Sequence, residues 1–525
     1  MKNVPLVTES VLAGWRQAGL RDSETLWGLA SKADRDRLAV ICPRNGLVSY
    51  GTLLDEAECL AATWFADGIA PGDIVMLQIP NWYEFVLAHL ALSRLGAITL
   101  PTLPLYRERE LTYIAGTSGA RAIVGAPDQA GCPPEALYQR LLDLPQLRHF
   151  WRADDLRAAA TGDPSSLPPP PEPDDVTIVM ATSGTTGEPK LILHSHRSTV
   201  GGVLQRIAQE MTLDAGDVMF MPSPISHATG LQYGVRMSIV VGATLLLQQR
   251  WEPHEAAALI ARHKARWAMG ATPFLFDLVG LPKSERESLS SLGLFVCGGA
   301  PVPESLAAEA TEALPQVSLM AAWGMSETGI VTLVRPGDPI GKVTGSDGRP
   351  VPGWEVRVAS PGGEPIPVGQ EGEIQCRGAA LFEGYLGRQD LTQEAVPDGW
   401  LRSGDIGRMD GDGYLRCLGR IKDLIIRGGV NLSATEIEDA VRLHPAIRDV
   451  AVIGAPDPRL GERVCAVVVA DGELPTVLEL GKFLLAQGLA KQKLPESIVL
   501  VDALPATATG KIQKHLLRAR LSAET

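Results

Sequence analysis

A loop rich in glycine and hydroxyl residues is the part of the sequence with the clearest chemistry. Residues 182–190 read TSGTTGEPK and end in a lysine. Glycine lets the backbone turn tightly and approach a ligand closely, so main-chain N–H groups and nearby hydroxyls can point at one anion. The lysine adds a mobile positive charge. We expect phosphate to be bound by Thr182, Ser183, Gly184, Thr185, Thr186, Gly187 and Lys190.

The spacing of this loop differs from that of the P-loop of nucleotide hydrolases. Gly184 and Gly187 are separated by two residues, whereas the P-loop has four residues between its glycines and a hydroxyl residue after its lysine. Leu191 follows the lysine here, which excludes the P-loop reading. An ordinary surface turn remains the alternative for the loop taken alone. Apolar runs at 176–181 and 191–193 predict that the loop joins two buried strands.

Five further motifs follow this loop in order. They are CGGAP at 297–301, WGMSETG at 323–329, SGD at 403–405, GRIKDLIIRGGVN at 419–431 and ATATGKIQK at 506–514. With these motifs the chain resembles, over nearly its whole length, the adenylate-forming enzymes, which include acyl- and aryl-CoA ligases, stand-alone adenylating enzymes and luciferases. The resemblance implies ATP-dependent activation of a small-molecule carboxylic acid, with ATP, Mg²⁺ and coenzyme A taking part.

The pattern of apolar residues indicates the fold class. Helical stretches at 53–65 and 81–95 alternate with strands at 73–78 and 97–100, which predicts parallel sheets covered by helices. A proline-rich stretch at 163–175 is expected to be a surface connector that is not helical.

A smaller unit follows residue 419. Ser433 and Glu436 form the pattern of a capping box that opens a helix, and strands are expected near 448–453 and 463–469. A chain of 525 residues is too long to fold around a single hydrophobic core. We expect an α/β fold in which domain 1–421 holds parallel sheets, flanking helices and a β-subdomain, and domain 422–525 is a small mobile α+β unit.

The composition limits the kinds of partner and the cellular location that we expect for this protein. The net charge is −13 and no block of lysine or arginine stands out, so nucleic-acid binding is not expected. The first residues have no continuous apolar signal core, and no apolar stretch is long enough for a transmembrane segment, which favours a cytoplasmic protein. Seven scattered cysteines without CxxC spacing predict reduced, mostly structural thiols. A homodimer is compatible with the sequence.

The resemblance assigns roles to three residues at the reacting atoms. Lys511 matches the mobile lysine that bridges the acid and the α-phosphate, and Glu327 matches the carboxylate that binds the Mg²⁺ carried by ATP. Ser326 stands where the family more often has threonine and keeps the hydroxyl for the α-phosphate. Taken alone, these residues also have a structural explanation. A lysine in a turn is usually solvated, and a lone glutamate usually caps a helix or forms a local hydrogen bond.

Further residues match the nucleotide site and the hinge of the family. Trp323 replaces the usual tyrosine and keeps an aromatic face for stacking. Asp405 resembles the acceptor of the ribose hydroxyls, supported by Arg420, and Lys422 lies at the hinge. In a second domain arrangement, Gly428 and Gly429 would line a passage for a pantetheine thiol. The remaining expected nucleotide contacts are Gly298, Gly299, Ala300, Pro301, Gly324 and Met325.

The acid pocket is expected between His227 and Trp323. His227 matches a gating position, while His194 and His196 are read as structural or close to phosphate. Relatives that activate dihydroxybenzoate have an asparagine where this chain has Ala228. Small residues predict a roomy, mainly apolar pocket for a medium-length, alicyclic or aryl acid; they are Gly270, Ala271, Gly298, Gly299 and Ala322.

Two alternatives stay open at this point. A carrier-protein phosphopantetheine presents the same thiol arm as coenzyme A, so an acyl or aryl carrier protein is an equally suited acceptor. A catalytically silent relative that binds nucleotide or acyl ligand is the alternative from another class, against which the presence of Lys511, Glu327 and Asp405 argues.

Overall fold

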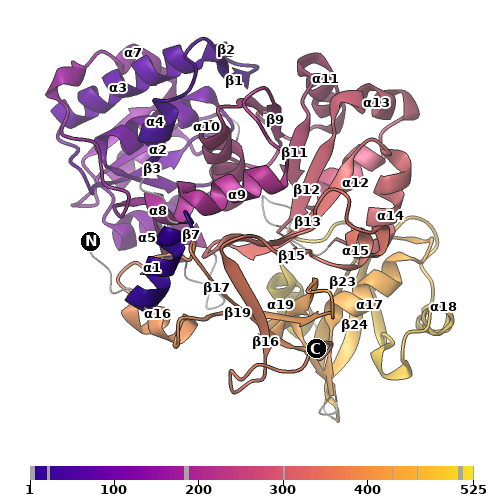
Figure 1. The fold of residues 1–525 in the computed structure, drawn as a ribbon. Coiled ribbons are helices and arrows are strands. Elements are labelled where there is room, and N and C mark those ends of the chain that lie inside the picture. The colour runs from indigo at the N-terminus through magenta and orange to yellow at the C-terminus, as the bar shows by residue number, and fades with distance from the viewer. Residues whose placement is uncertain are drawn as a thin grey trace.

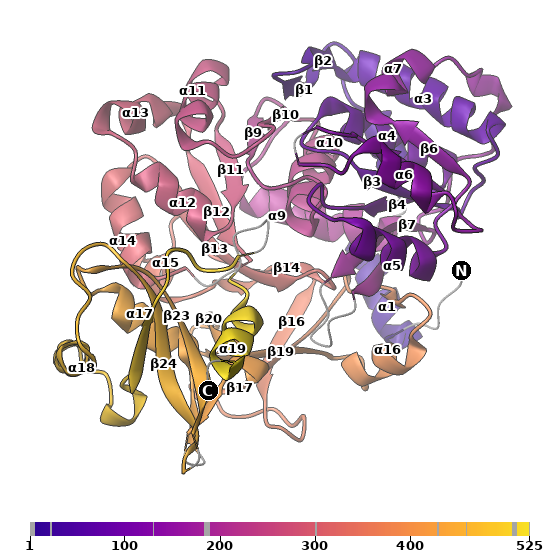
Figure 2. The same cartoon turned by 180° about the vertical axis from the view of Figure 1, so that it is seen from behind.

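The computed structural model describes residues 6–20, 24–129, 131–182, 189–299, 302–427, 430–457, 459–506 and 512–523. Within these residues two large sheets form the upper part of the molecule, a four-stranded sheet lies below them, and the C-terminal unit lies beside that sheet (Figure 1). The view from behind shows the same division (Figure 2). The fold is therefore α/β, with a large N-terminal domain, a β-subdomain and a small C-terminal α+β domain.

A nine-stranded sheet forms one half of the large domain. Its central strands run parallel, and its two edges are antiparallel hairpins. In spatial order the strands are β15 (Arg349–Pro350), β14 (Gly329–Leu333), β13 (Ser318–Met325), β12 (Leu294–Gly298), β11 (Trp267–Gly270), β9 (Val218–Met221), β10 (Thr244–Leu247), β1 (Leu38–Cys42) and β2 (Gly46–Ser49).

A seven-stranded sheet forms the other half. Five strands pair in parallel, and two antiparallel strands complete one edge. In spatial order they are β18 (Gly384–Tyr385), β8 (Lys190–Ser195), β7 (Val176–Thr182), β4 (Ile98–Pro101), β3 (Ile74–Gln78), β5 (Ala122–Gly125) and β6 (His149–Arg152). The glycine-rich loop thus joins two core strands as predicted, but the strands pair antiparallel, because a short connection cannot cross over to a parallel neighbour.

The β-subdomain and the C-terminal domain each have their own sheet. Four antiparallel strands form the first: β16 (Trp354–Ala359), β17 (Gly372–Gly378), β19 (Leu401–Met409) and β20 (Leu415–Arg420). The second contains β22 (Val430–Leu432), β21 (Ile425–Arg427), β24 (Gly461–Ala470), β23 (Ile447–Asp457) and β25 (Ser497–Leu500). A short 3-10 turn, η5 (Ile421–Asp423), connects the two sheets and contains the predicted boundary between residues 421 and 422.

Helices cover both large sheets and the C-terminal sheet. In the first part of the chain they are α1 (Glu9–Gln17), α2 (Leu26–Ala30), α3 (Tyr50–Ala66), α4 (Tyr83–Leu95), α5 (Glu108–Ser118), α6 (Glu135–Leu141) and α7 (Leu156–Ala159). The middle part has α8 (His196–Val200), α9 (Gly202–Glu210), the π-helix η3 (Gly230–Arg236), α10 (Met237–Val241), α11 (Pro253–His263), α12 (Thr272–Val279), α13 (Lys283–Ser288), α14 (Glu304–Ala313) and α15 (Ile340–Gly345). The last part has α16 (Gln389–Ala395), α17 (Ala434–Arg442), α18 (Val477–Ala486) and α19 (Lys514–Ala523).

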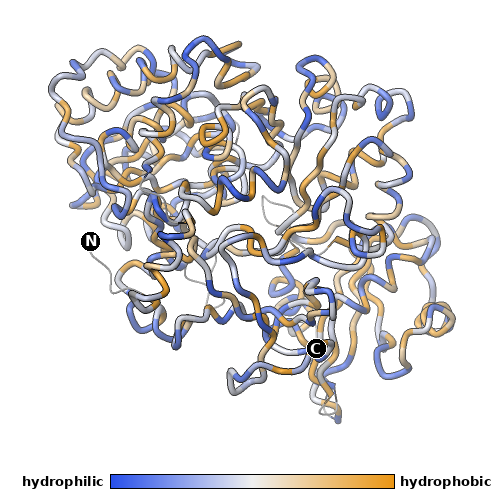
Figure 3. The backbone as a smooth tube through the Cα atoms, viewed as in Figure 1, coloured by the Kyte–Doolittle hydropathy of each residue, from blue (hydrophilic) through white to orange (hydrophobic). Residues whose placement is uncertain are grey.

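Apolar residues follow the strands and the inner helix faces, while polar residues gather on the outer turns (Figure 3). Helix α4 is buried along its whole length and packs against α3. Both helices agree with the sequence prediction. The proline-rich connector is likewise free of α-helix, although it contains a three-residue 3-10 turn, η2 (Pro164–Ser166). No helix among the described residues is both long enough and apolar enough to cross a bilayer.

Ser433 caps α17, but half of the predicted capping box is replaced by another contact. The Ser433 hydroxyl accepts a hydrogen bond from the backbone N–H of Glu436 at 3.3 Å. It also donates to the carbonyl of Leu418 in β20 at 2.7 Å, which ties the helix to the β-subdomain. The Glu436 carboxylate bonds to Lys493 instead of returning to the Ser433 backbone, because an ammonium group is a stronger partner than a neutral N–H.

Candidate active site

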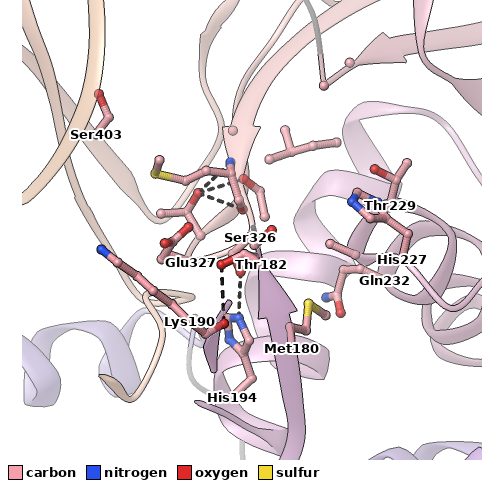
Figure 4. A pocket seen from close by; sticks show the side chains of 18 of the residues that line it. Met180, Thr182, Lys190, His194, His227, Thr229, Gln232, Ser326, Glu327 and Ser403 are labelled. Carbon is pink, nitrogen blue, oxygen red and sulfur yellow. Dashed lines mark hydrogen bonds between the residues drawn. The ribbon is translucent and has the colours of Figure 1, made fainter. Parts of the chain in front are cut away.

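A cavity of about 820 Å³ lies where the two large sheets, the β-subdomain and the C-terminal domain meet. Its walls come from the ends of β7 and β8, the turn after β13, helices α8 and α9, the π-helix and the β19–β20 sheet. Figure 4 shows Lys190, Ser326 and Glu327 near the strand ends, with His227 and Gln232 on the helical side. Residues from most of the sequence motifs therefore surround one space.

The two ends of the phosphate loop lie at this cavity. Thr182 is the last residue of β7 and Lys190 the first of β8, and both line the wall. The Thr182 hydroxyl donates to the Lys190 carbonyl at 3.4 Å (Figure 4). The Lys190 ammonium lies 4.9 Å from the centre of the Tyr385 ring, a cation–π contact. Five of the predicted loop residues lie outside the described residues: Ser183, Gly184, Thr185, Thr186 and Gly187.

Ser326 and Glu327 form the turn between β13 and β14 and both line the cavity. Glu327 Oε1 accepts a hydrogen bond from the Tyr385 hydroxyl at 2.8 Å, and its carbonyl accepts from the backbone N–H of Phe382 at 2.9 Å. Burial raises the pKa of Tyr385, with the Glu327 charge adding to the effect. The tyrosine therefore stays a neutral hydrogen-bond donor to Glu327.

His194 and Tyr385 are site residues that the sequence reading did not assign to the site. His194 Nε2 lies 2.8 Å from the Ser326 carbonyl, which can only accept, so Nε2 carries the proton. His194 was expected from the sequence to be structural or close to phosphate, and in the structure it braces the cavity wall through Ser326. Tyr385 belongs to a two-residue strand without a recognisable pattern, so only its antiparallel pairing with β8 brings it here.

Asp405 and Trp323 lie behind the cavity wall. Neither is among the residues that line the cavity, whereas Ser403, Gly404 and Arg420 are. The Trp323 indole N–H donates to Asp405 Oδ2 at 2.9 Å, and Arg420 Nε lies 3.1 Å from Oδ1. Asp405 and Arg420 thus lie together, and their binding of ribose stays a prediction. Trp323, expected to offer an aromatic face for stacking, is buried and does not line the cavity, because its indole is directed to Asp405.

Glycines form the wall between the two strands β12 and β13. Gly298, Gly299, Gly324 and Met325 line the cavity, while Ala300 and Pro301 lie outside the described residues. A Cβ at residue 324 would meet the carbonyl oxygen of Gly329 at 1.9 Å, so only glycine fits this position. Gly299 has a φ of +86°, a conformation that other residues rarely adopt.

The expected acid side of the cavity is largely apolar. His227 and Ala228 line it, together with Val203, Leu204 and Ile207 of α9. Of the five small residues expected here, Ala271, Gly298, Gly299 and Ala322 line the cavity. Gly270 does not, which corrects the prediction. Its lack of a side chain makes room for Phe274, whose ring would lie 2.7 Å from a Cβ at this position.

The C-terminal domain reaches the same cavity. Ala506 and Gln513 line it, and an antiparallel bridge joins Ala506 to Ile512. These residues flank the segment 507–511. Lys511 lies outside the described residues, as do Gly428 and Gly429. Lys422 lies in η5, does not line the cavity, and belongs to the connection between the two sheets, where a hinge was expected.

The residues around Glu327 offer few ligands for the expected Mg²⁺. Among the residues that the structure describes, no three of His, Cys, Asp and Glu lie close enough to hold a metal ion. The Glu327 carboxylate fits Mg²⁺ that is held mainly by phosphate oxygens and water. The seven cysteines are all free, and burial raises the pKa of Cys297 to about 12. This thiol lies in the core and not among the cavity-lining residues.

Three buried histidines should make folding sensitive to acid. Burial lowers the pKa of His194 from 6.5 to about 4, and it lowers those of His89 and His196, with buried Arg236 adding to each effect. In the unfolded chain these rings bind protons near their ordinary pKa. Between about pH 6.5 and 4 the unfolded state therefore binds more protons, and the free energy of unfolding falls as pH falls.

We expect the His194→Gln variant to lose less stability than the wild type on acidification through this window. The difference in slope should be up to about 1.4 kcal/mol per pH unit. Urea unfolding at several pH values measures it. His254→Gln is a control of opposite sign. Glu285 raises the pKa of the exposed His254, so protonated His254 stabilises the folded protein at low pH, and this variant should lose more stability than the wild type on acidification. Equal slopes for wild type and His194→Gln would contradict the expectation.

Comparison with known proteins identifies the family. Residues 29–386 match the AMP-binding enzyme family, and residues 436–511 match the AMP-binding enzyme C-terminal domain. The chain is 34% identical over 536 residues to the medium-chain fatty-acid–CoA ligase of Escherichia coli, covering 99% of this chain and 94% of that protein. It is 35% identical over 537 residues to the salicyl-AMP ligase / salicyl-S-ArCP synthetase of Mycobacterium tuberculosis, covering 98% and 94%.

Solved structures agree with these matches. ATP-bound MatB from Rhodopseudomonas palustris superposes with a TM-score of 0.88 at 28% identity, covering 95% of this chain and 99% of that chain. The match to both family regions, the identity over nearly the full length and the shared fold lead to one conclusion. The chain belongs to the adenylate-forming AMP-binding enzymes, which are AMP-forming acid:thiol ligases.

Proposed function

We propose that this enzyme activates a carboxylic acid with ATP, releases pyrophosphate, and transfers the acyl group to coenzyme A. The observation that carries the proposal is the convergence at one cavity of the phosphate-loop ends, the Ser326–Glu327 turn and both flanks of segment 507–511. Because two anions must meet in the first step, catalysis depends on positioning and on neutralising their charge.

In the first step a carboxylate oxygen attacks the α-phosphorus, and the bond between the α-phosphorus and the bridging oxygen to the β-phosphate breaks. We assign the phosphates to the loop from Thr182 to Lys190 and the α-phosphate to the Ser326 hydroxyl. Glu327 would hold Mg²⁺, which supplies positive charge at the phosphate oxygens when bound. Lys511 would bridge the acid and the α-phosphate. The positions of Ala506 and Gln513 at the cavity support this role.

In the second step the thiol sulfur attacks the acyl carbon and AMP leaves. We propose that rotation about Lys422 withdraws Lys511 and brings Gly428 and Gly429 to a passage for the thiol arm. The position of η5 between two independent sheets supports this hinge. Contacts such as the Ser433–Leu418 hydrogen bond, and the 3.8 Å approach of Arg416 to Asp439, would break in that rotation.

The acid is proposed to be of medium length, alicyclic or aryl, without a charge at its far end. Apolar side chains of α9 and small residues at Ala228, Ala271 and Ala322 support an apolar tail. Three acidic residues line the cavity, and none of them lies on the α9 wall. Glu327 is in the turn after β13, Glu373 in β17 and Glu394 in α16. Similarity to a medium-chain fatty-acid–CoA ligase and to a feruloyl-CoA synthase, the latter 33% identical, fits this class.

A carrier-protein phosphopantetheine is the second candidate acceptor. The similar salicyl-AMP ligase / salicyl-S-ArCP synthetase and the pyochelin synthase PchD favour it. Both acceptors present the same thiol arm, so the cavity itself does not separate them.

The first experiment incubates the enzyme with ATP, Mg²⁺, coenzyme A and a panel of short, medium, alicyclic and aryl acids, followed by mass spectrometry. We expect an acyl-CoA from a medium-length, alicyclic or aryl acid. An acyl-adenylate without thioester would support the carrier-protein acceptor. Failure to form either product with any acid would contradict the proposed activity and favour a catalytically silent relative.

Replacing Lys511 should remove most of the adenylation activity. We expect Lys511→Ala to slow pyrophosphate release by about a hundredfold or more, since loss of one group that stabilises transition-state charge typically has this effect. Lys482→Ala, an exposed lysine of α18 in the same domain, should leave the rate unchanged. An unaffected rate in Lys511→Ala would refute the mechanism.

Tyr385 should matter through its hydrogen bond to Glu327. We expect Tyr385→Phe to lower kcat for adenylation about tenfold and to raise the Mg²⁺ concentration needed for half-maximal rate, because a hydrogen bond to a charged group is lost. The matched control is Tyr414→Phe, which removes a 2.8 Å bond to Asp338 away from the cavity. Equal Mg²⁺ dependence in the two variants would show that the Tyr385 hydroxyl does not position Glu327.

A further inference from the structure

A buried asparagine connects the two large sheets beside the acid side of the cavity. Asn81 lies between β3 and α4, is 6% exposed and does not line the cavity. Its amide nitrogen donates to the carbonyl of Ser223 at 3.1 Å, and its Oδ1 accepts from the backbone N–H of Ile225 at 2.8 Å. Ser223 and Ile225 follow β9 of the nine-stranded sheet, so these two hydrogen bonds join one sheet to the other.

The backbone that Asn81 contacts needs partners that a strand cannot easily supply. Residues 222–226 read PSPIS, and both prolines lack an N–H, so this segment cannot pair regularly with a neighbouring strand. Ser223 and Ile225 are buried, and their polar backbone groups must therefore be satisfied within the protein. A carboxamide offers both a donor and an acceptor, as a peptide group does. The Asn81 side chain thus takes the place of a pairing strand.

Tight packing surrounds this contact on both sides. The two residues after Asn81, at the start of α4, are fully buried, and so is the rest of that helix. On the other side, a Cβ at Gly230 would lie 2.2 Å from the carbonyl oxygen of Pro224, so the first residue of the π-helix touches the segment directly. A shift of the segment would therefore also move η3, which carries Gln232 and Tyr233 of the cavity wall.

The segment held by Asn81 continues directly into the expected acid side of the cavity. The backbone N–H of His227 donates to the carbonyl of Pro224 at 3.0 Å, which places His227 one turn from the residues that Asn81 contacts. Figure 4 shows His227 and Thr229 on the same side of the pocket. Five residues of this segment line the cavity: Ser223, Ser226, His227, Ala228 and Thr229. The Asn81 amide thus fixes the base of this wall.

We propose that Asn81 is a positioning residue for the acid: its carboxamide fixes the wall formed by residues 223–229 and thereby limits the size of the acid that the cavity accepts. This rests on the proposed function, which places the acid against this wall. Asn81 acts on the acid only through the backbone of Ser223 and Ile225. A rigid wall discriminates between acids that differ by one carbon, whereas a wall that gives way accepts both.

The first test is amide hydrogen exchange of the full chain, followed by mass spectrometry of the peptide that covers residues 222–230. In the wild type we expect slow exchange of the Ile225 N–H, as in a β-strand, although Ile225 belongs to no strand. Rapid exchange of all amides in this peptide would overturn the proposal. The measurement needs neither a variant nor a substrate, so it does not depend on whether a substituted chain folds.

Asn81→Leu removes the amide and keeps the shape of the side chain. We expect about tenfold faster exchange in the peptide 222–230, about a tenfold higher KM for the preferred acid and an unchanged KM for ATP. The preference for that acid over its homologue with one more carbon should fall about tenfold.

Gln248→Met is the matched control. Gln248 follows β10 of the nine-stranded sheet, is 1% exposed, and donates to the carbonyl of Glu252 at 2.9 Å without lining the cavity. Because this buried amide also holds a turn after a strand, its loss should cost similar local packing. We expect both KM values, and exchange in the peptide 222–230, to stay as in the wild type.

The outcomes separate this inference from the proposed function. Faster exchange in Asn81→Leu with an unchanged KM and preference for the acid would refute the positioning role. An equal rise in the KM values for ATP and the acid would show general loosening of the cavity and would refute it too. Absence of product with every acid in the wild type would refute the proposed function and the role in acid selection with it. The exchange result separately decides whether Asn81 holds the segment.

Discussion

The hydrogen bond from His194 Nε2 to the Ser326 carbonyl joins the two large sheets at the edge of the cavity. His194 belongs to β8, which continues from the phosphate loop, and Ser326 belongs to the turn that carries Glu327. Both partners are buried or half-buried, so breaking the bond would leave polar groups without water to replace them. The position of Lys190 relative to Glu327 therefore depends on this contact. Burial lowers the pKa of His194, so its ring is neutral at this contact and donates through Nε2.

The Glu327 carboxylate at the cavity is held by a neutral donor, the Tyr385 hydroxyl. Asp405, behind the wall, accepts from the Trp323 indole and also pairs with Arg420. A neutral donor fixes the direction of a carboxylate without cancelling its charge, whereas a lysine or arginine would compete with a cationic ligand. Lys190 follows the same principle, because its ammonium lies over an aromatic ring. The site thus keeps its charges available for the proposed phosphate and metal ligands.

The sequence predicted much of this fold because local periodicity and tertiary burial agree along the chain. The strand at 73–78 and the helix at 81–95 appear as β3 and α4 with bounds shifted by one or two residues. The strands flanking the loop 182–190 were predicted from their apolar runs and appear as β7 and β8, whereas phosphate binding by the loop stays a prediction. The Ser433 cap is also a local feature. Its partner Glu436 was misjudged, because Lys493 comes from a distant part of the chain.

The sequence by itself determined the family, the order of motifs, the two-domain α/β plan and the residue types available for adenylation. These properties can be read from short segments, because motifs and secondary-structure patterns involve residues that are close together in the sequence. Tertiary structure decided which side chains share the cavity: it brought in Tyr385 and His194, left Gly270 outside, and directed the Trp323 indole to Asp405. The reason is that side-chain direction and burial are set by contacts between elements far apart in sequence, and no local pattern encodes them.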